Sequence, residues 1–115
     1  MIFSGFFSKG AAGPDAGEIS HDDLLAAVKA ETCHVIDVRE PNEYAAGHVP
    51  GAKNHPLSRF DAKKLPSGKP VVLVCRSGAR SATALNKARA AGRADVRHYR
   101  AGTMGWRQAG GALED

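Results

Sequence analysis

Apolar residues in this chain form two kinds of pattern, short continuous runs and stripes at helical spacing. The run Val71-Val72-Leu73-Val74 is continuously apolar, as is typical of a central parallel strand covered on both faces. Residues 34–38 are β-branched at three of five positions and predict a second buried strand. Residues 96–99 predict a third strand, and residues 52–55 a short fourth one.

Helical patterns lie between the predicted strands. Ser20 is a suitable N-cap, and Asp23 forms a shortened capping box with it, so that a helix is expected from there to about residue 30. A longer helix is expected over residues 79–91, because a stripe of small apolar residues recurs there and Gly92 follows as a C-cap. Shorter helical segments are predicted at residues 41–44, 57–64 and 105–109.

Strands that alternate with helices indicate an α/β fold with a mainly parallel sheet. In such sheets, ligands bind at the carboxyl ends of the strands. Three segments rich in chemically active side chains each follow a predicted strand, namely residues 37–40, 75–80 and 101–106. The topology therefore predicts that all three lie at one edge of the sheet.

The chain of 115 residues fits a single domain. Residues 1–17 are expected to be a flexible N-terminal segment, since residues 9–17 have the composition of a linker. The folded domain is expected over residues 18–110, followed by a C-terminal tail at 111–115.

Charge is distributed unevenly over a net +4. Residues 76–115 hold 8 basic and 3 acidic side chains, and seven of the basic ones are arginines. This half of the chain is expected to attract anions. Without a recognisable nucleic-acid motif or a membrane-length apolar run, we expect no nucleic-acid partner, no stable membrane insertion and a cytoplasmic location.

The segment after the clearest strand carries the strongest candidate chemistry. Cys75 ends that strand and opens the loop 75–80, and a helix follows at once. Backbone N–H groups of such a loop point inward and the helix N-terminus adds positive potential, which together form an anion cradle. Gly78 lets the backbone curl closely, and Arg76 and Arg80 add positive charge. A cysteine held there is expected to have a lowered pKa and to act as a nucleophile.

The other candidate side chains have plainer interpretations. Cys33 lacks these activating features and is expected to be structural, on the opposite edge of the sheet from Cys75. Asp37 lies in a buried strand and must be paired there. Arg39 and Glu43 are expected to pair with each other. The histidines have no company typical of metal ligands, and no metal site is predicted.

Four stretches of the chain resemble motifs of the rhodanese-like family, in order and at family-like spacing. They are Asp37-Val38-Arg39-Glu40-Pro41-Asn42-Glu43-Tyr44, Gly47-His48-Val49-Pro50-Gly51-Ala52, Cys75-Arg76-Ser77-Gly78-Ala79-Arg80-Ser81 and Gly102-Thr103-Met104-Gly105-Trp106. The resemblance spans about residues 18–110. One difference is Ala101, which stands where the family often has a glycine, and alanine adopts positive φ only at a cost.

The resemblance implies the rhodanese fold, with a five-stranded, mostly parallel sheet flanked by helices. It implies that Cys75 takes sulfane sulfur from a small anionic donor such as thiosulfate and passes it to an acceptor, cyanide or a thiol, including a protein thiol. The sulfur would wait on Cys75 as a persulfide, without another cofactor. Asp37 and Arg39 would hold the surrounding loops without contacting the sulfur. The persulfide would be bound by the backbone amides of Arg76, Ser77, Gly78, Ala79 and Arg80.

Two further functions are weighed against sulfur transfer. A sulfur-relay or protein-binding module would dock a partner protein and turn over small molecules weakly. A phosphatase or arsenate reductase is disfavoured by the length of the loop, because four residues separate Cys75 from Arg80 whereas the related phosphatases have five. The shorter loop suits a single terminal sulfur atom.

Overall fold

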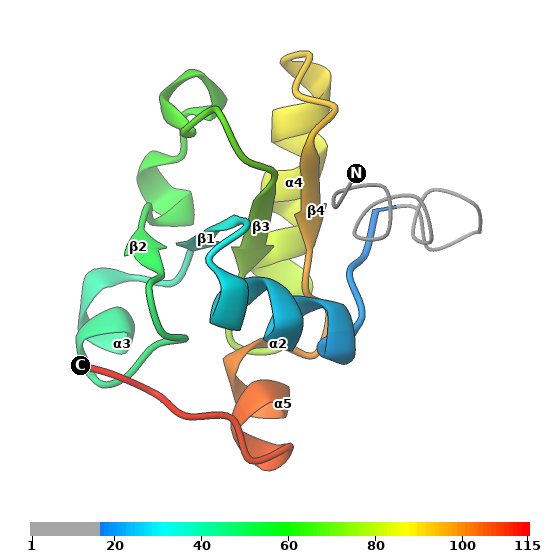
Figure 1. Ribbon diagram of the computed structural model, residues 1–115. Helices are drawn as coiled ribbons and strands as arrows, with labels where there is room; N and C mark the ends of the chain where they lie inside the picture. The colour runs from blue at the N-terminus through cyan, green and yellow to red at the C-terminus, as the bar shows by residue number, and fades with distance from the viewer. Residues whose placement is uncertain (1–16) are drawn as a thin grey trace.

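The computed structural model describes residues 17–115. The predicted flexible segment 1–17 lies outside the described residues, apart from Gly17. Four strands form one parallel sheet in the spatial order β2-β1-β3-β4 (Figure 1). Their bounds are Lys53–Asn54 for β2, His34–Asp37 for β1, Val71–Val74 for β3 and Val96–His98 for β4.

Helices cover both faces of this sheet (Figure 1). Side chains of β3 alternate between the faces, as a strand requires. Leu73 faces the side of α4, whereas Val72 and Val74 face the side of α2 and α5. The helices are α2 (His21–Ala30), α3 (Pro41–Ala45), α4 (Ala79–Ala90) and α5 (Gly102–Gln108), with 3-10 turns η1 (Leu57–Arg59) and η2 (Ala62–Lys64).

The predicted N-terminus of α2 is confirmed in detail. The Ser20 side chain accepts a hydrogen bond from the backbone N–H of Asp23 at 3.1 Å. Ile19 and Leu24 are both buried in the same apolar cluster. The cap and these apolar contacts fix where the chain turns from the sheet edge into the helix.

The sheet has four strands in the described part of the chain, rather than the five expected. The place of the fifth strand, beside β4, is taken by a single bridge between Glu18 and His98. The Ile19 N–H donates to the His98 carbonyl at 3.0 Å, and the His98 N–H donates to the Gly17 carbonyl at 2.9 Å. Because Ser20 already caps α2, the extended stretch ends here and cannot lengthen toward the C-terminus.

Two predicted helices differ from the structure. The expected helix 57–64 is two 3-10 turns, because the backbone is extended at Phe60 and Asp61 and the Asp61 carboxylate starts the second turn by accepting from the Lys63 N–H. The last helix begins at Gly102 rather than Gly105. Its first amides need no capping side chain, since they donate to carbonyls of the loop after β3.

The C-terminal residues pack back onto the domain. The Trp106 indole N–H donates to the Ala112 carbonyl at 2.8 Å, and Glu114 exchanges two backbone hydrogen bonds with His48. This segment runs from the end of α5 to the side of α3 (Figure 1). None of the helices between residues 17 and 115 has the length and apolar character that crossing a bilayer requires.

Candidate active site

The three segments expected at one edge of the sheet do meet there. Strand β3 lies between β1 and β4, so the loops that follow these three strands are adjacent. The backbone N–H groups of Thr103 and Met104 donate to the carbonyls of Cys75 and Arg76 at 2.8 and 3.1 Å. The start of α5 thus holds the loop after β3 from outside.

The sulfur of Cys75 lies in a cradle of hydrogen-bond donors at the start of α4. Cys75 is only 1% exposed. Its Sγ accepts from the backbone N–H of Gly78 at 3.1 Å and of Ser81 at 3.3 Å. The Ser81 hydroxyl oxygen lies 3.6 Å from the same sulfur. The first turn of α4 therefore directs its free amides at the cysteine.

This cradle lowers the pKa of the Cys75 thiol. Burial acts most strongly and in the opposite direction, since it disfavours the charged form. Hydrogen bonds from the Ser81 side chain and from the backbone of Ser81, Gly78 and Ser77 together outweigh it. The thiolate, which is the nucleophilic form, is accordingly stabilised by fixed donors rather than by water.

Two glycines allow the close approach of the two loops. Gly78 has a φ of +102°, and a Cβ atom there would lie 2.4 Å from the Arg100 carbonyl oxygen. Gly102 has a φ of +70°, and its Cβ would lie 2.2 Å from the Arg76 carbonyl oxygen. Ala101 has an ordinary φ of −67°, so the alanine in place of the family's frequent glycine does not distort this loop.

Of the predicted cradle residues, Gly78 donates its backbone N–H to the Cys75 sulfur at 3.1 Å, and the Ser77 backbone also contributes to the lowered pKa. The side chains of Arg76, Ser77 and Ala79 are exposed around the rim. A pocket of about 590 Å³ opens beside this rim. Its lining combines arginines with apolar and polar side chains, including Arg39, Glu43, Arg76, Thr103, Met104 and Arg107.

The sequence predicted that Arg39 pairs with Glu43, and this prediction is wrong. Arg39 pairs with Asp37 instead. Its Nη2 donates to Asp37 Oδ2 at 2.8 Å and to the Gly47 carbonyl at 2.7 Å, and its Nε donates to Asp37 Oδ1 at 3.0 Å. Both side chains are buried. The carboxylate at the end of β1 thus fixes Arg39 two residues later, which shapes the loop before α3.

Glu43 pairs instead with Arg80, across the candidate site. Arg80 Nη1 and Nη2 donate to Glu43 Oε1 and Oε2 at 2.7 and 3.0 Å, a two-pronged arrangement. The hydrogen bonds with Glu43 raise the pKa of Arg80, and the Cys75 charge raises it further. The Arg80 charge therefore acts near the sulfur while its donors are held by α3.

The Glu43–Arg80 pair predicts a pH dependence of stability. Hydrogen bonds from Arg80 lower the pKa of Glu43 to about 2, from its ordinary 4.5. A lowered folded-state pKa means that the pair stabilises the fold above pH 4.5 and that this contribution is lost as the pH falls toward 2. Glu43→Gln should therefore lower the melting temperature at pH 7 more than at pH 3, as measured by circular dichroism.

Arg80→Gln is the matched control for this measurement, because it breaks the same pair from the other side. Its melting temperature should also lie further below that of the native protein at pH 7 than at pH 3. A difference that stays constant between pH 7 and pH 3 would contradict the assignment.

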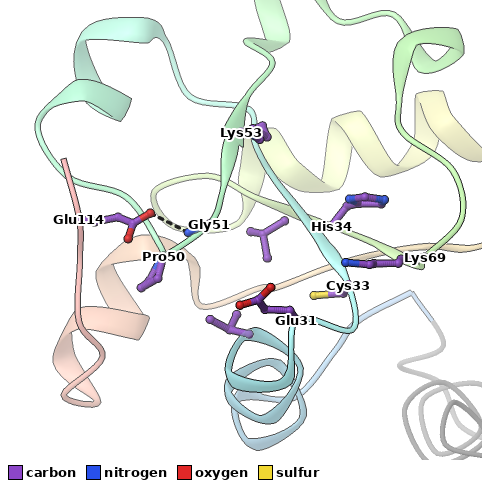
Figure 2. A pocket seen from close by; sticks show the side chains of 10 residues that line it. Glu31, Cys33, His34, Pro50, Gly51, Lys53, Lys69 and Glu114 are labelled. Atoms are coloured by element: carbon purple, nitrogen blue, oxygen red, sulfur yellow. Dashed lines mark hydrogen bonds between the residues drawn. The ribbon is translucent and has the colours of Figure 1, made fainter.

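Cys33 lies away from this site, beside a separate cavity of about 460 Å³ at the start of β1 (Figure 2). Cys33 and His34 line this cavity together with Lys69 (Figure 2). Burial raises the pKa of the Cys33 thiol to about 11, although Lys69 acts to lower it. Both cysteines are free, and the parallel strands β1 and β3 place them at opposite ends of the sheet, as expected.

Three side chains near the sulfur were not predicted from the sequence to belong to the site. Ser81 presents both its amide and its hydroxyl to Cys75. Thr103 donates from its N–H and its Oγ1 to the Cys75 carbonyl. His98 contacts Ser81 from β4. Ser81 and Thr103 stand within the recognised motifs, which was the available signal, whereas nothing in the local sequence around His98 indicates its contact.

Among the described residues there is no cluster of three or more His, Cys, Asp or Glu side chains that could hold a metal ion. The acid and base groups of the site are instead paired with arginines or with hydroxyl groups. The Cys75 sulfur, held by fixed N–H donors that lower its pKa, supports nucleophilic attack by a stabilised sulfur anion.

Comparison with known proteins agrees with this geometry. Residues 20–109 match the family model of the rhodanese-like domain. The chain is 42% identical over 78 residues to the Synechocystis protein slr1261, covering 66% of this chain and 44% of that one. It is 31% identical over 94 residues to the thiosulfate sulfurtransferase GlpE of Pseudoalteromonas translucida, covering 79% of this chain and 89% of that one.

The fold comparison points to the same group. The structure of the human single-domain sulfurtransferase TSTD1 superposes with a TM-score of 0.72 at 27% identity, covering 80% of this chain and 96% of that one. The chain spans less than half the length of the Synechocystis relative. Since the domain match covers residues 20–109, most of the chain, the protein belongs to the rhodanese-like domain family.

Proposed function

We propose that this protein moves sulfane sulfur from a small anionic donor, such as thiosulfate, to a thiophilic acceptor through a persulfide on Cys75. The observation that carries the proposal is the position of the Cys75 sulfur, held by the Gly78 and Ser81 amides at the N-terminus of α4. Fixed donors keep the Cys75 sulfur as a thiolate, which is the form that attacks the donor and the form that leaves when the acceptor reacts, and the cycle requires both roles.

The first step is attack by the Cys75 thiolate on the outer sulfur of thiosulfate. A sulfur–sulfur bond forms to Cys75, the sulfur–sulfur bond of thiosulfate breaks, and sulfite leaves with its electron pair. The persulfide carries the negative charge on its outer sulfur, at the open side of the cradle. Exposed Arg76 lies on the rim there and supports an anionic donor by charge.

The second step passes the outer sulfur to the acceptor. Cyanide or a thiolate attacks that sulfur, the bond to Cys75 breaks, and the Cys75 thiolate is regenerated in the cradle as thiocyanate or a new persulfide departs. The pocket of about 590 Å³ beside the rim gives the acceptor its approach. Sulfur itself is the only group carried, so the proposed cycle requires no further cofactor.

A second candidate is a relay that serves a partner protein in place of small molecules. Two exposed arginines, Arg76 and Arg107, line the pocket together with apolar Met104 and Leu113. A mixed basic and apolar lining of this kind suits an acidic protein surface that presents a thiol. Slow turnover with free cyanide, combined with rapid loading of Cys75, would favour this relay.

The test is mass spectrometry of the intact protein after incubation with thiosulfate. We expect the mass of one added sulfur atom, and we expect cyanide to remove it with release of thiocyanate. Steady-state kinetics should give parallel double-reciprocal plots, because sulfite leaves before the acceptor reacts. Absence of the added sulfur, or intersecting plots, would contradict the proposed cycle.

A further inference from the structure

Three buried side chains from three different elements form a line that ends at the candidate nucleophile. His98 of β4 is 6% exposed, and its Nδ1 lies 2.9 Å from the Ser81 Oγ. Ser81 of α4 is fully buried, and its Oγ lies 3.6 Å from the Sγ of Cys75 at the end of β3. All three residues are buried, so the contacts reach the sulfur within the protein interior.

The Ser81 hydroxyl has one proton for several neighbours. A serine hydroxyl offers one donor and two acceptor positions. The Gly78 carbonyl, 3.2 Å from Ser81 Oγ, can only accept, and so can a Cys75 thiolate. If His98 Nδ1 were also an acceptor, three acceptors would compete for this proton. If Nδ1 carries a hydrogen, it occupies a lone pair of the hydroxyl and leaves the proton free for the sulfur.

We propose that His98 is a positioning residue for the sulfur chemistry. In this arrangement its Nδ1–H donates to the Ser81 Oγ, and the hydroxyl proton is thereby directed to the Cys75 Sγ whenever that sulfur is a thiolate. This proposal rests on the proposed function in that it assigns the Cys75 thiolate a working role. It concerns the thiolate itself, however, and its test does not depend on sulfur transfer.

The groups around His98 are consistent with a neutral ring whose tautomer is selected. Its Nε2 lies 3.9 Å from the Glu18 carboxylate, which in turn lies 3.9 Å from the Arg100 guanidinium. Burial lowers the pKa of His98, while Glu18 raises it and Arg100 lowers it. From β3 and α4 the facing groups are Cys75 and Ser81. A neutral imidazole has one N–H, and we place it at Nδ1, because the 2.9 Å contact with Ser81 is within hydrogen-bond distance whereas the 3.9 Å between Nε2 and the Glu18 carboxylate is not.

The hydrogen bond from the Ser81 hydroxyl to Cys75 is expected at two stages of the proposed cycle and not at the persulfide stage. The Cys75 thiolate is present before the donor reacts and again when the acceptor has taken the sulfur. In between, the charge is on the outer sulfur of the persulfide, beyond the reach of the buried hydroxyl. Ser81 can then donate to the Gly78 carbonyl instead. His98 would therefore favour attack by Cys75 and its departure, and would leave the waiting persulfide to the backbone amides.

The rate of Cys75 alkylation by iodoacetamide, measured against pH, tests this role. His98→Leu removes the N–H that donates to Ser81, and we expect alkylation at pH 6 to slow about tenfold. The reason is that losing a hydrogen bond to the charged thiolate lowers the fraction of Cys75 in that form by about this factor. His98→Asn keeps an N–H near the same position and should restore most of the rate. His34→Leu, at the start of β1 and so at the opposite end of the sheet from Cys75, should leave the rate unchanged.

Coupling between the two residues is tested by Ser81→Ala. If His98 acts through the hydroxyl, His98→Leu added to Ser81→Ala should cause no further slowing. An unchanged pH profile in folded His98→Leu, or additive effects in the double variant, would overturn the proposal. These results stand apart from the proposed function, because a shifted alkylation profile without persulfide formation would overturn sulfur transfer alone.

A measurement on the unmodified protein keeps the proposal falsifiable if His98→Leu does not fold. Nitrogen-15 NMR distinguishes the protonated ring nitrogen of a histidine from the bare one. At neutral pH we expect the His98 Nδ1 to be protonated and the Nε2 to be bare. The opposite tautomer would overturn the proposal, since the ring would then take the Ser81 proton rather than free it.

Discussion

Cys75→Ser is expected to abolish sulfur transfer while the domain stays folded. The nucleophile is lost, because a serine hydroxyl is not ionised at neutral pH, and loss of a nucleophile lowers turnover by about 10³-fold or more. The serine oxygen is smaller than the sulfur, so it fits the same space, and it can still accept from the Gly78 and Ser81 amides that contact the sulfur. The free energy of unfolding should therefore change by about 1 kcal/mol at most. Thiocyanate formation and urea unfolding measure the two effects.

Cys33→Ser is the matched control for this variant. Cys33 lies at the opposite end of the sheet, and its pKa is raised rather than lowered. We expect it to retain most of the activity and to gain one sulfur from thiosulfate as the native protein does. If the Cys33 variant were as inactive as the Cys75 variant, the one-cysteine cycle would be wrong.

Gly102→Ala is expected to have the largest effect on stability. Its φ of +70° is unfavourable for alanine, and the new Cβ would lie 2.2 Å from the Arg76 carbonyl oxygen and 2.7 Å from the Ser77 nitrogen. These are backbone atoms of the loop that follows the nucleophile, so relief of the clash must displace that loop. We expect a loss of more than about 3 kcal/mol in the free energy of unfolding, measured in urea.

Gly92→Ala separates the conformational cost from the clash. Gly92 also has a positive φ, +91°, but a Cβ there would meet nothing within 4 Å. It should cost only about 1 kcal/mol, the penalty of the backbone conformation alone. Equal losses in the two glycine variants would contradict the view that α5 presses directly on the loop after β3.

The sequence predicted those features that depend on local pattern. The continuous run at residues 71–74 identified the central strand, and the cysteine followed by a glycine and a helix identified the candidate nucleophile. Ser20 and Asp23 located the start of α2 correctly. Burial periodicity and capping chemistry involve residues that are near in sequence, and they can be evaluated without knowing the fold.

Pairings between distant residues could not be predicted in the same way. Arg39 and Glu43 are close in sequence and opposite in charge, but each has a different partner. Their choice depends on α4 placing Arg80 near α3, which is set by tertiary packing. The contact of His98 with Ser81 depends likewise on the register of β4 beside β3. The missing fifth strand depends on how soon α2 begins after Ile19.

The support that α5 gives to the loop after β3 has a consequence for biosynthesis. The ribosome adds Cys75 before Thr103 and Met104, whose amides hold the carbonyls of Cys75 and Arg76. A nascent chain therefore exposes the thiol before its cradle is secured, at a stage when it has only ordinary acidity. The lowered pKa of the Cys75 thiol should then be established only as α5 docks onto the loop after β3.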